Sequence, residues 1–222
     1  MWRDALLVAG KDLRIEARTR VALNQVAPFA VLVLLLFAFA FDSDRTVLRD
    51  ATPGLFWVAV LFSALLAVQR AFALEAVDGI PDALRLSGLS PTGIFLGKVA
   101  AVAAQLIVLE ALLGLGVVVL YDARLDSPIL LVAASVAATL GLAAVGCLYG
   151  ILAAGQKVAQ TLLPLLLLPA LAPLLLAATQ AWSAGVDGVA SEGWRWLALL
   201  VLFAAAYLAA GLATFGILLD DA

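Results

Sequence analysis

The 222 residues are 65% hydrophobic and 13% charged, with a formal net charge of −3. Soluble domains carry about a quarter charged residues, so this composition indicates a protein of the lipid bilayer. The acidic balance and the lack of a basic block argue against a nucleic-acid partner. The chain has no histidine, and its one cysteine, Cys147, lies in an apolar run. We therefore expect no internal disulfide, no metal site and no cofactor held by this chain.

The sequence contains no nucleotide-binding loop of the form G-x-x-x-x-G-K-[ST], because Gly97-Lys98 lacks both the upstream glycine and a following Ser or Thr. Histidine-based catalytic triads are excluded by composition. The chain is therefore predicted not to be an enzyme and not to hydrolyse a nucleotide itself. An intramembrane enzyme would have to depend on Glu110 or on scattered Ser and Thr residues.

The first element in chain order is a helix over residues 1–20. Two neighbouring faces follow from its spacing, one apolar and one basic. The apolar face consists of Trp2, Leu6, Ala9, Leu13 and Ala17, and the basic face of Arg3, Lys11, Arg14 and Arg18. This pattern is typical of a helix that lies along the membrane surface with its charges near anionic head groups. A basic flank that only fixes the membrane topology is the alternative.

Apolar runs then predict six membrane spans, each long enough at about 1.5 Å per residue to cross a hydrocarbon core of about 30 Å. The fold class is therefore all-α, a polytopic membrane protein with one domain over residues 1–222. We expect a charged loop at 42–52 and a polar loop at 180–193. The predicted spans are about 22–41, 54–74, 94–121, 129–154, 158–178 and 194–219.

The fifth span contains Pro164, Pro169 and Pro173. Each proline removes a backbone donor and tends to kink a helix. In a bilayer the freed carbonyls need partners or a cavity.

Six spans place both termini on the same side of the membrane. Nine basic residues lie on that side and four on the other, so both termini are predicted to be cytoplasmic. Aromatic residues near the outer ends of the spans are expected to form an interfacial belt. These residues are Trp57, Tyr121, Trp182, Trp194 and Trp196.

The loop at 75–93 carries a helix-start pattern at residues 78–82 (DGIPD) and a stop at Gly88. These signals predict a short cytoplasmic helix whose apolar face could dock into a partner. An ordinary interfacial loop helix is the alternative. The predicted face consists of Ile80, Ala83 and Leu84, with Arg85 on its flank.

Glu110 is the one carboxylate deep in a predicted span. An ionisable group there costs about 2.5–3.5 kcal/mol on insertion scales, so something must compensate it. One hypothesis is a role in moving a proton or substrate. The other is a protonated or hydrogen-bonded side chain that packs against another helix or against a second copy of the chain.

The order E-x-x-D-G-(x)4-L from Glu75, followed by a proline-containing turn and Gly97-Lys98, resembles permeases of the ABC-2-type export superfamily. More narrowly, residues 53–59 (PGLFWVA), residues 63–66 (SALL) and the proline-rich fifth span resemble the haem exporter B family of permeases from the cytochrome c maturation system. The likeness covers nearly the whole chain. Pro81 departs from it, because an ordinary helix former is expected there.

The resemblance implies a permease subunit in the bacterial inner membrane, two copies of which pair with two copies of a separate ATPase that binds ATP. It implies haem as the substrate, and as partners haem-handling membrane subunits and a periplasmic haem chaperone. The loop would then couple the ATPase to the spans through Glu75, Asp78, Gly79, Ile80, Ala83, Leu84, Arg85 and Leu86. Candidates for a substrate path or for helix packing are Trp57, Arg70, Glu110, Pro164 and Pro169.

Two other functions fit the same pattern. An ABC-2-type permease could carry a lipid or a polysaccharide, which would show in the substrate that stimulates the ATPase. A non-transporting scaffold could use ATP hydrolysis to release a haem-loaded chaperone, and haem would then not cross a sealed bilayer.

Overall fold

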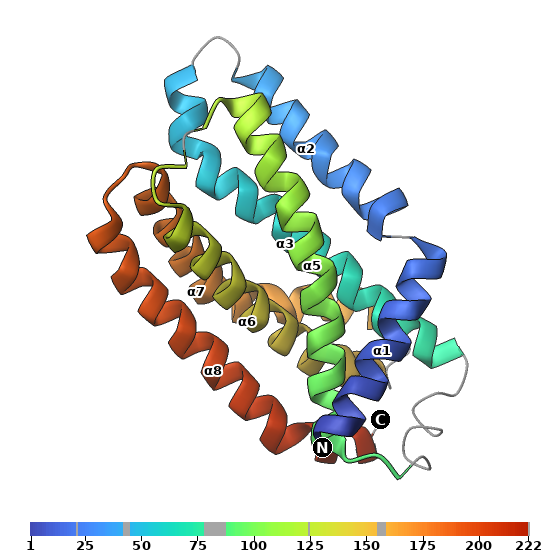
Figure 1. Cartoon of the computed structure of the whole chain (residues 1–222). Helices are drawn as coiled ribbons and strands as arrows, with labels where there is room; N and C mark the ends of the chain where they lie inside the picture. The colour runs from blue at the N-terminus through green and yellow to red at the C-terminus, as the bar shows by residue number, and fades with distance from the viewer. Residues whose placement is uncertain (21, 42–44, 78–87, 124, 155–158, 222) are drawn as a thin grey trace.

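The computed structural model of the chain describes residues 1–20, 22–41, 45–77, 88–123, 125–154 and 159–221 (Figure 1). Side chains are described in these ranges except at 22, 23, 45, 73–77, 153, 154, 159–164, 166, 220 and 221. All regular elements in the described ranges are helices, which confirms the all-α class. Five of these helices are long and apolar enough to cross a membrane, and a sixth candidate arises if α1 and α2 form one span bent by 52°.

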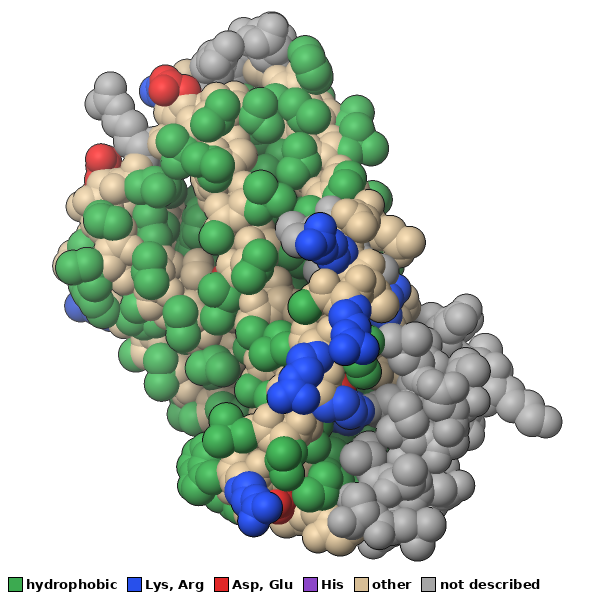
Figure 2. All heavy atoms as spheres, turned by 45° about the vertical axis from the view of Figure 1, so that its right-hand side comes forward, with side chains coloured by type: hydrophobic (Ala, Val, Ile, Leu, Met, Phe, Trp, Pro, Cys, Tyr) green, Lys and Arg blue, Asp and Glu red, His purple; other side chains and the backbone are tan. Residues whose placement is uncertain are grey.

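The N-terminal helix α1 (Trp2–Thr19) carries charged residues at seven of its 18 positions, which makes burial of α1 in a hydrocarbon core costly. Ala5, Val8 and Ala9 are buried on the side that meets α5, whereas Trp2 and Leu6 are 71% and 74% exposed. Of the predicted apolar face, Ala9 thus packs toward the bundle, whereas its large members Trp2, Leu6 and Leu13 are exposed. Figure 2 shows basic side chains gathered in a band beside a largely hydrophobic surface. The exposed basic residues of this N-terminal segment are Arg3, Arg14, Arg18 and Arg20.

A π-helical turn, η1 (Ala22–Val26), leads into the short helix α2 (Ala27–Ala40). Helix α2 packs against α3 and α5. Tyr121 Oη, at the far end of α5, donates a hydrogen bond of 2.9 Å to Leu34 O of α2. This bond fixes α2 to the central helix of the bundle.

The second long helix, α3 (Arg45–Val77), begins nine residues before the predicted span and includes Pro53. The charged loop predicted at 42–52 is therefore wrong from Arg45 onward. Two polar contacts support the extra turns: Thr52 Oγ1 donates to Leu48 O, and Arg49 pairs with Asp122 at 2.6 Å. A sequence pattern of charges next to proline is read as a loop because a distant partner such as Asp122 is not visible in the local sequence.

Helix α5 (Pro91–Tyr121) runs through the middle of the molecule (Figure 1) and contacts α1, α2, α3, α6 and α8. Ser90 precedes Pro91 in an extended conformation, and Gly88 has φ +70°. Proline suits a first helical position, where its missing N–H is not needed. The left-handed Asp122 (φ 51°) ends the helix.

The remaining helices are α6 (Pro128–Ala154), α7 (Ala159–Val186) and α8 (Ala190–Asp221). The polar loop predicted at 180–193 is wrong over 180–186 and over 190–193, because α7 continues to Val186 and α8 begins at Ala190. Ser127 N donates to Gly185 O at 3.1 Å, and a side chain at Gly185 would lie 2.7 Å from Leu131. This tight packing against the start of α6 holds the extra turns of α7 in place.

The three aromatic residues predicted for a belt at the outer ends of the second, third and fifth spans are core residues instead. Trp57, Tyr121 and Trp182 are 1%, 0% and 5% exposed. Of the other two candidates, Trp194 is 48% exposed and Trp196 is partly buried against the core. Hydropathy places an aromatic residue along a span, but the direction in which it points depends on the packing of neighbouring helices.

Candidate functional site

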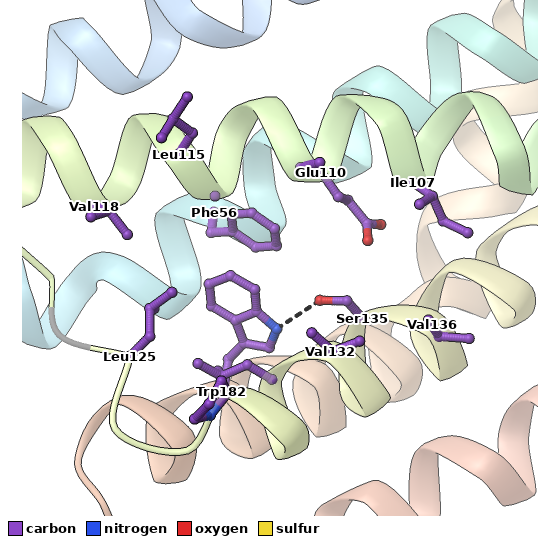
Figure 3. Close-up of a pocket in the computed structure, with 14 residues that line it drawn as sticks. Phe56, Ile107, Glu110, Leu115, Val118, Leu125, Val132, Ser135, Val136 and Trp182 are labelled. Carbon is purple, nitrogen blue, oxygen red and sulfur yellow. Dashed lines mark hydrogen bonds between the residues drawn. The ribbon is translucent and has the colours of Figure 1, made fainter.

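A lateral cavity of about 440 Å³ lies between α5 and α6. Phe56 of α3 and Trp182 of α7 form its inner wall, and Glu110 projects from α5 into the space between the helices (Figure 3). Apart from Glu110 and Ser135, the wall is almost entirely apolar. The lining residues are Phe56, Ile107, Glu110, Ala111, Gly114, Leu115, Val118, Leu125, Pro128, Leu131, Val132, Ser135, Val136 and Trp182.

The carboxyl of Glu110 is held by α6. The side chain is 7% exposed, and its Oε1 lies 2.5 Å from Thr139 Oγ1. The same threonine oxygen lies 2.7 Å from Ser135 O. A hydroxyl has one proton to donate. Each contact has a proton of its own when the carboxyl is protonated and donates to Thr139, while Thr139 donates to Ser135 O. In that arrangement Glu110 is a neutral acid, the form that suits a bilayer interior.

Aromatic stacking makes the inner wall rigid. The rings of Phe56 and Trp182 are stacked with centroids 3.8 Å apart, and Trp57 meets both rings edge-on. Trp182 Nε1 donates a 3.1 Å hydrogen bond to Ser135 Oγ (Figure 3). In contrast, the buried Nε1 of Trp57 has no hydrogen-bond partner among the described residues. Trp57 does not line the cavity, and its role in the structure is packing between α3 and α7.

A second polar cluster lies at the other end of α5, where α1 crosses it. The two helices approach so closely that a Cβ at Gly97 would lie 2.7 Å from Ala5 O, and one at Gly93 would lie 2.7 Å from Asp4 Cβ. Small residues spaced four apart commonly allow such close helix contacts in membranes. The close approach brings the polar side chains of α1 onto the start of α5.

Lys98 is the most buried charged residue of this junction, at 2% exposed. Its Nζ lies 3.9 Å from Asp12 Oδ2 of α1 and 4.8 Å from the centroid of the Phe72 ring. A carboxylate and an aromatic face both stabilise a buried cation. Asp12 also pairs with Lys11 at 3.0 Å. Asp12 therefore links the charged side of α1 to α5.

Asp4 ties the first turn of α1 to the residue that precedes α5. Its Oδ2 accepts hydrogen bonds from Ser90 Oγ at 2.6 Å and from Ser90 N at 3.2 Å, and the N-terminal ammonium lies 3.2 Å away. The bonds from Ser90, aided by the N-terminus, lower the pKa of Asp4 from 3.8 to about 2. Farther along α1, Glu16 lies 4.0 Å from Arg70 of α3.

The predicted coupling residues Asp78, Gly79, Ile80, Ala83, Leu84, Arg85 and Leu86 lie outside the described residues. Glu75 belongs to α3, but its side chain is outside the described set, as is that of Pro164 in α7. Pro169 is exposed on α7. Arg70 and Glu110, the other candidates for a path or for packing, lie at the two separate clusters described above.

Helix α7 runs through all three of its prolines as one helix. Tyr207 Oη of α8 donates a 2.6 Å hydrogen bond to Ala170 O, in the turn before Pro173. Tyr207 thus ties α8 to the backbone of α7. The carbonyl that Pro173 deprives of a donor is that of Pro169, four residues earlier, next to the bonded Ala170. No group of three or more metal-ligating side chains is found among the described residues.

Sequence reasoning missed the residues that complete both clusters. Thr139 and Ser135 lie four positions apart on α6. The sequence signal for them was the presence of two hydroxyl side chains at helical spacing in an alanine-rich span. Asp12 and Asp4 were visible as acids on a basic helix. Their partners Lys98 and Ser90 lie 86 positions away, so no local pattern connects them.

Comparisons with known proteins agree with one another. Residues 3–218 match the family described as CcmB protein. A protein from Pseudomonas aeruginosa named Heme exporter protein B is 29% identical over 211 residues, which cover 89% of each chain. Proteins with this name from Haemophilus influenzae and Rhodobacter capsulatus are 29% and 28% identical, and the matches cover 78% and 82% of this chain and 79% and 84% of theirs. Since the family match extends from α1 to α8, the chain belongs to the CcmB protein family.

Proposed function

We propose that the chain is the membrane permease subunit of an ABC-type haem export complex that serves cytochrome c maturation. The observation that carries the proposal is the match to the CcmB family over residues 3–218, with relatives named Heme exporter protein B. The sequence contains no nucleotide-binding loop. A separate ATPase subunit would therefore bind ATP and supply the energy, and this chain would not be an enzyme.

The proposed complex contains two copies of this permease and two of the ATPase in the bacterial inner membrane, with both termini in the cytoplasm. The distribution of basic residues, nine on one side of the predicted spans and four on the other, supports this orientation. Haem is the substrate in this proposal. Because the chain has no histidine, the haem ligands would belong to the haem-handling membrane subunits and to a periplasmic chaperone.

The ATPase would dock on the stretch between α3 and α5, which includes residues 78–87. The junction of α1 with α5 supports this assignment, because Ser90 and Lys98, just after the stretch, are both held by carboxylates of α1. Motion delivered to this region would enter α5, which contacts five other helices. The ATPase would in this way shift the bundle between two states.

Purification from the native membrane in mild detergent tests the complex first. We expect mass spectrometry to find an ATPase and haem-handling membrane proteins with the chain. Recovery of the chain alone, or with an unrelated ATPase, would contradict the proposed assembly.

A Leu84→Asp variant tests the docking site. We expect normal membrane insertion and loss of the co-purified ATPase, because a charge replaces the central apolar residue of the predicted helix. Val189→Asp is the matched control, since Val189 is exposed in the turn between α7 and α8 at the opposite end of the bundle. Full recovery of the ATPase with Leu84→Asp would refute the docking assignment.

Transport itself is tested with the purified complex in sealed vesicles. The proposal expects haem to stimulate ATP hydrolysis and to cross the bilayer in an ATP-dependent manner. Stimulation by a lipid or polysaccharide would point to a different cargo. ATP-dependent release of a chaperone without passage of haem would point to a scaffold.

A further inference from the structure

We infer that the cavity between α5 and α6 binds a membrane-dissolved amphiphile, a molecule with an apolar body and one hydrogen-bond donor, and that the donor bonds Glu110 Oε2. The inference goes beyond the proposed function, because a chain that only transmitted motion would need no ligand site. It concerns this chain alone and depends neither on the ATPase nor on the identity of the exported substrate.

The cavity has the size and lining of a small-molecule site. Its volume of about 440 Å³ falls in the range of about 300–1,000 Å³ that is common for such sites. Binding pockets usually combine apolar walls with a few polar groups that orient the ligand. Here the walls are aliphatic and aromatic, and the polar groups are limited to Glu110 and Ser135.

The hydrogen bonds of Glu110 specify the polar end of the ligand. Oε1 is engaged by Thr139, whereas Oε2 has no hydrogen-bond partner among the described residues. When the protonated carboxyl donates its hydrogen bond from Oε1 to Thr139, Oε2 is a carbonyl oxygen that can only accept. Among the described residues the only fully buried side-chain polar atom without a partner is Trp57 Nε1, so Glu110 Oε2 keeps accessible surface. In a cavity that faces lipid and not water, an accessible acceptor without a donor is unfavourable. A ligand that carries a hydroxyl, a protonated carboxyl or an amine would complete this site.

The cavity opens sideways from the bundle. Its outer rim consists of side chains that are exposed on α5 and α6, of which Leu115 and Val132 are 62% and 64% exposed. Both helices are candidate membrane spans, so the rim faces lipid. A ligand would therefore arrive from the bilayer and needs an apolar body.

Gly114 offers a way to close the cavity without disturbing the bundle. It lines the cavity on α5, and a Cβ at this position would meet no atom within 4 Å. The absence of a side chain here leaves space that a ligand can use. A larger residue at position 114 would fill that space with little effect on helix packing.

The test uses the full chain in phosphatidylcholine nanodiscs and a palmitic acid that carries a photoreactive diazirine. We expect labelling that saturates, is displaced by unlabelled palmitic acid, and maps to α5 and α6. Methyl palmitate has the same chain but no donor, so it should compete about fivefold less well, as expected for the loss of one hydrogen bond.

Variants separate the two parts of the site. Gly114→Leu should lose the saturable labelling, whereas Gly54→Leu should keep it, because Gly54 of α3 also has open space at its Cβ but does not line the cavity. Glu110→Leu should weaken labelling about fivefold through the lost hydrogen bond. Glu110→Gln, which keeps an acceptor oxygen, should change it less than Glu110→Leu does.

Three outcomes would overturn the inference. The first is labelling that does not saturate and is as strong at exposed α8 residues such as Leu202 as it is in the cavity, which would mean ordinary lipid contact. The second is unchanged labelling of Gly114→Leu. The third is a disulfide between two chains that carry Gly114→Cys, which would show that a second copy fills the cavity; the native Cys147 is fully buried and does not interfere.

Discussion

Helix α5 carries two buried ionisable side chains that the protein treats in opposite ways. Lys98 is 2% exposed and lies near a carboxylate, Asp12, and an aromatic ring. Glu110 is 7% exposed and is held by the neutral hydroxyl of Thr139. The charged form of Lys98 is stabilised by an opposite charge from a surface helix, whereas Glu110 is arranged as a neutral acid. The comparison indicates that α5 has a charged end that is held by α1 and an uncharged middle within the bundle.

Removal of the Asp12 carboxylate, which lies next to Lys98, should have the largest effect on the free energy of unfolding. We expect Asp12→Leu to lower the free energy of unfolding by about 3 kcal/mol, the low end of the range for breaking a buried ion pair. Denaturant titration in mixed micelles would measure it. Lys11→Met is the matched control, because Lys11 also pairs with Asp12 but its side chain is 39% exposed, and exposed pairs contribute less than about 1 kcal/mol. Equal effects of the two variants would show that the burial of Lys98 is not decisive.

Removal of the Thr139 hydroxyl, which contacts Glu110, should have an intermediate effect on the free energy of unfolding. Thr139→Val keeps the shape of the side chain and removes its hydrogen bond, so we expect a loss of about 1–2 kcal/mol in the same titration. Thr214→Val is the control, since the hydroxyl of Thr214 is exposed and bonds only Ala210 O of its own helix. A Thr139→Val protein as stable as the control would contradict the account of Glu110 given above.

A change that preserves the neutral contact should have a small effect on stability. Glu110→Gln leaves an amide that can still donate to Thr139, and we expect a change below about 0.5 kcal/mol. A carboxylate that is ionised in the native state would give a different result, because its charge and charge-assisted bond would both disappear. A loss above about 2 kcal/mol would therefore contradict the neutral form.

The effect of pH on the α1 junction should be the smallest. The pKa of Asp4 is lowered from 3.8 to about 2 in the folded chain, so its ionised form stabilises α1 at pH values above about 4. As the pH falls towards 2 the carboxylate is protonated and this contribution is lost. Hydrogen exchange should show lower protection factors for the α1 amides at about pH 2.5 than at about pH 5, once each rate is divided by its intrinsic value at that pH. If Asp4→Asn showed the same difference between the two pH values, the pH dependence would come from a group other than Asp4.

Much of the architecture was predictable from hydropathy alone. Long apolar runs have to become helices in a bilayer because their backbone groups have no water to bond, and five of the predicted spans coincide with candidate membrane helices. The first span differs, since α2 has only 14 residues and reaches a membrane-spanning length only together with α1. Charge and proline signals failed where tertiary contacts extend a helix, as they do at Arg49 and Gly185.

The candidate site was predictable only in part. Glu110 stands out in the sequence because a carboxylate inside an apolar run is costly. Its partner Thr139 lies 29 positions away on the next helix, and which residues of α5 and α6 face each other depends on how the helices pack. The cavity could not be predicted for the same reason, because its wall combines residues from α3, α5, α6 and α7.

The contacts of α1 have a mechanical consequence. Glu16 of α1 reaches Arg70 near the end of α3, while Asp4 of the same helix holds Ser90 at the start of α5. The short helix α1 thus connects α3 and α5, the two helices that flank residues 78–87 in the sequence. A displacement of α3 or α5 at this end would therefore be transmitted through α1 to the other helix.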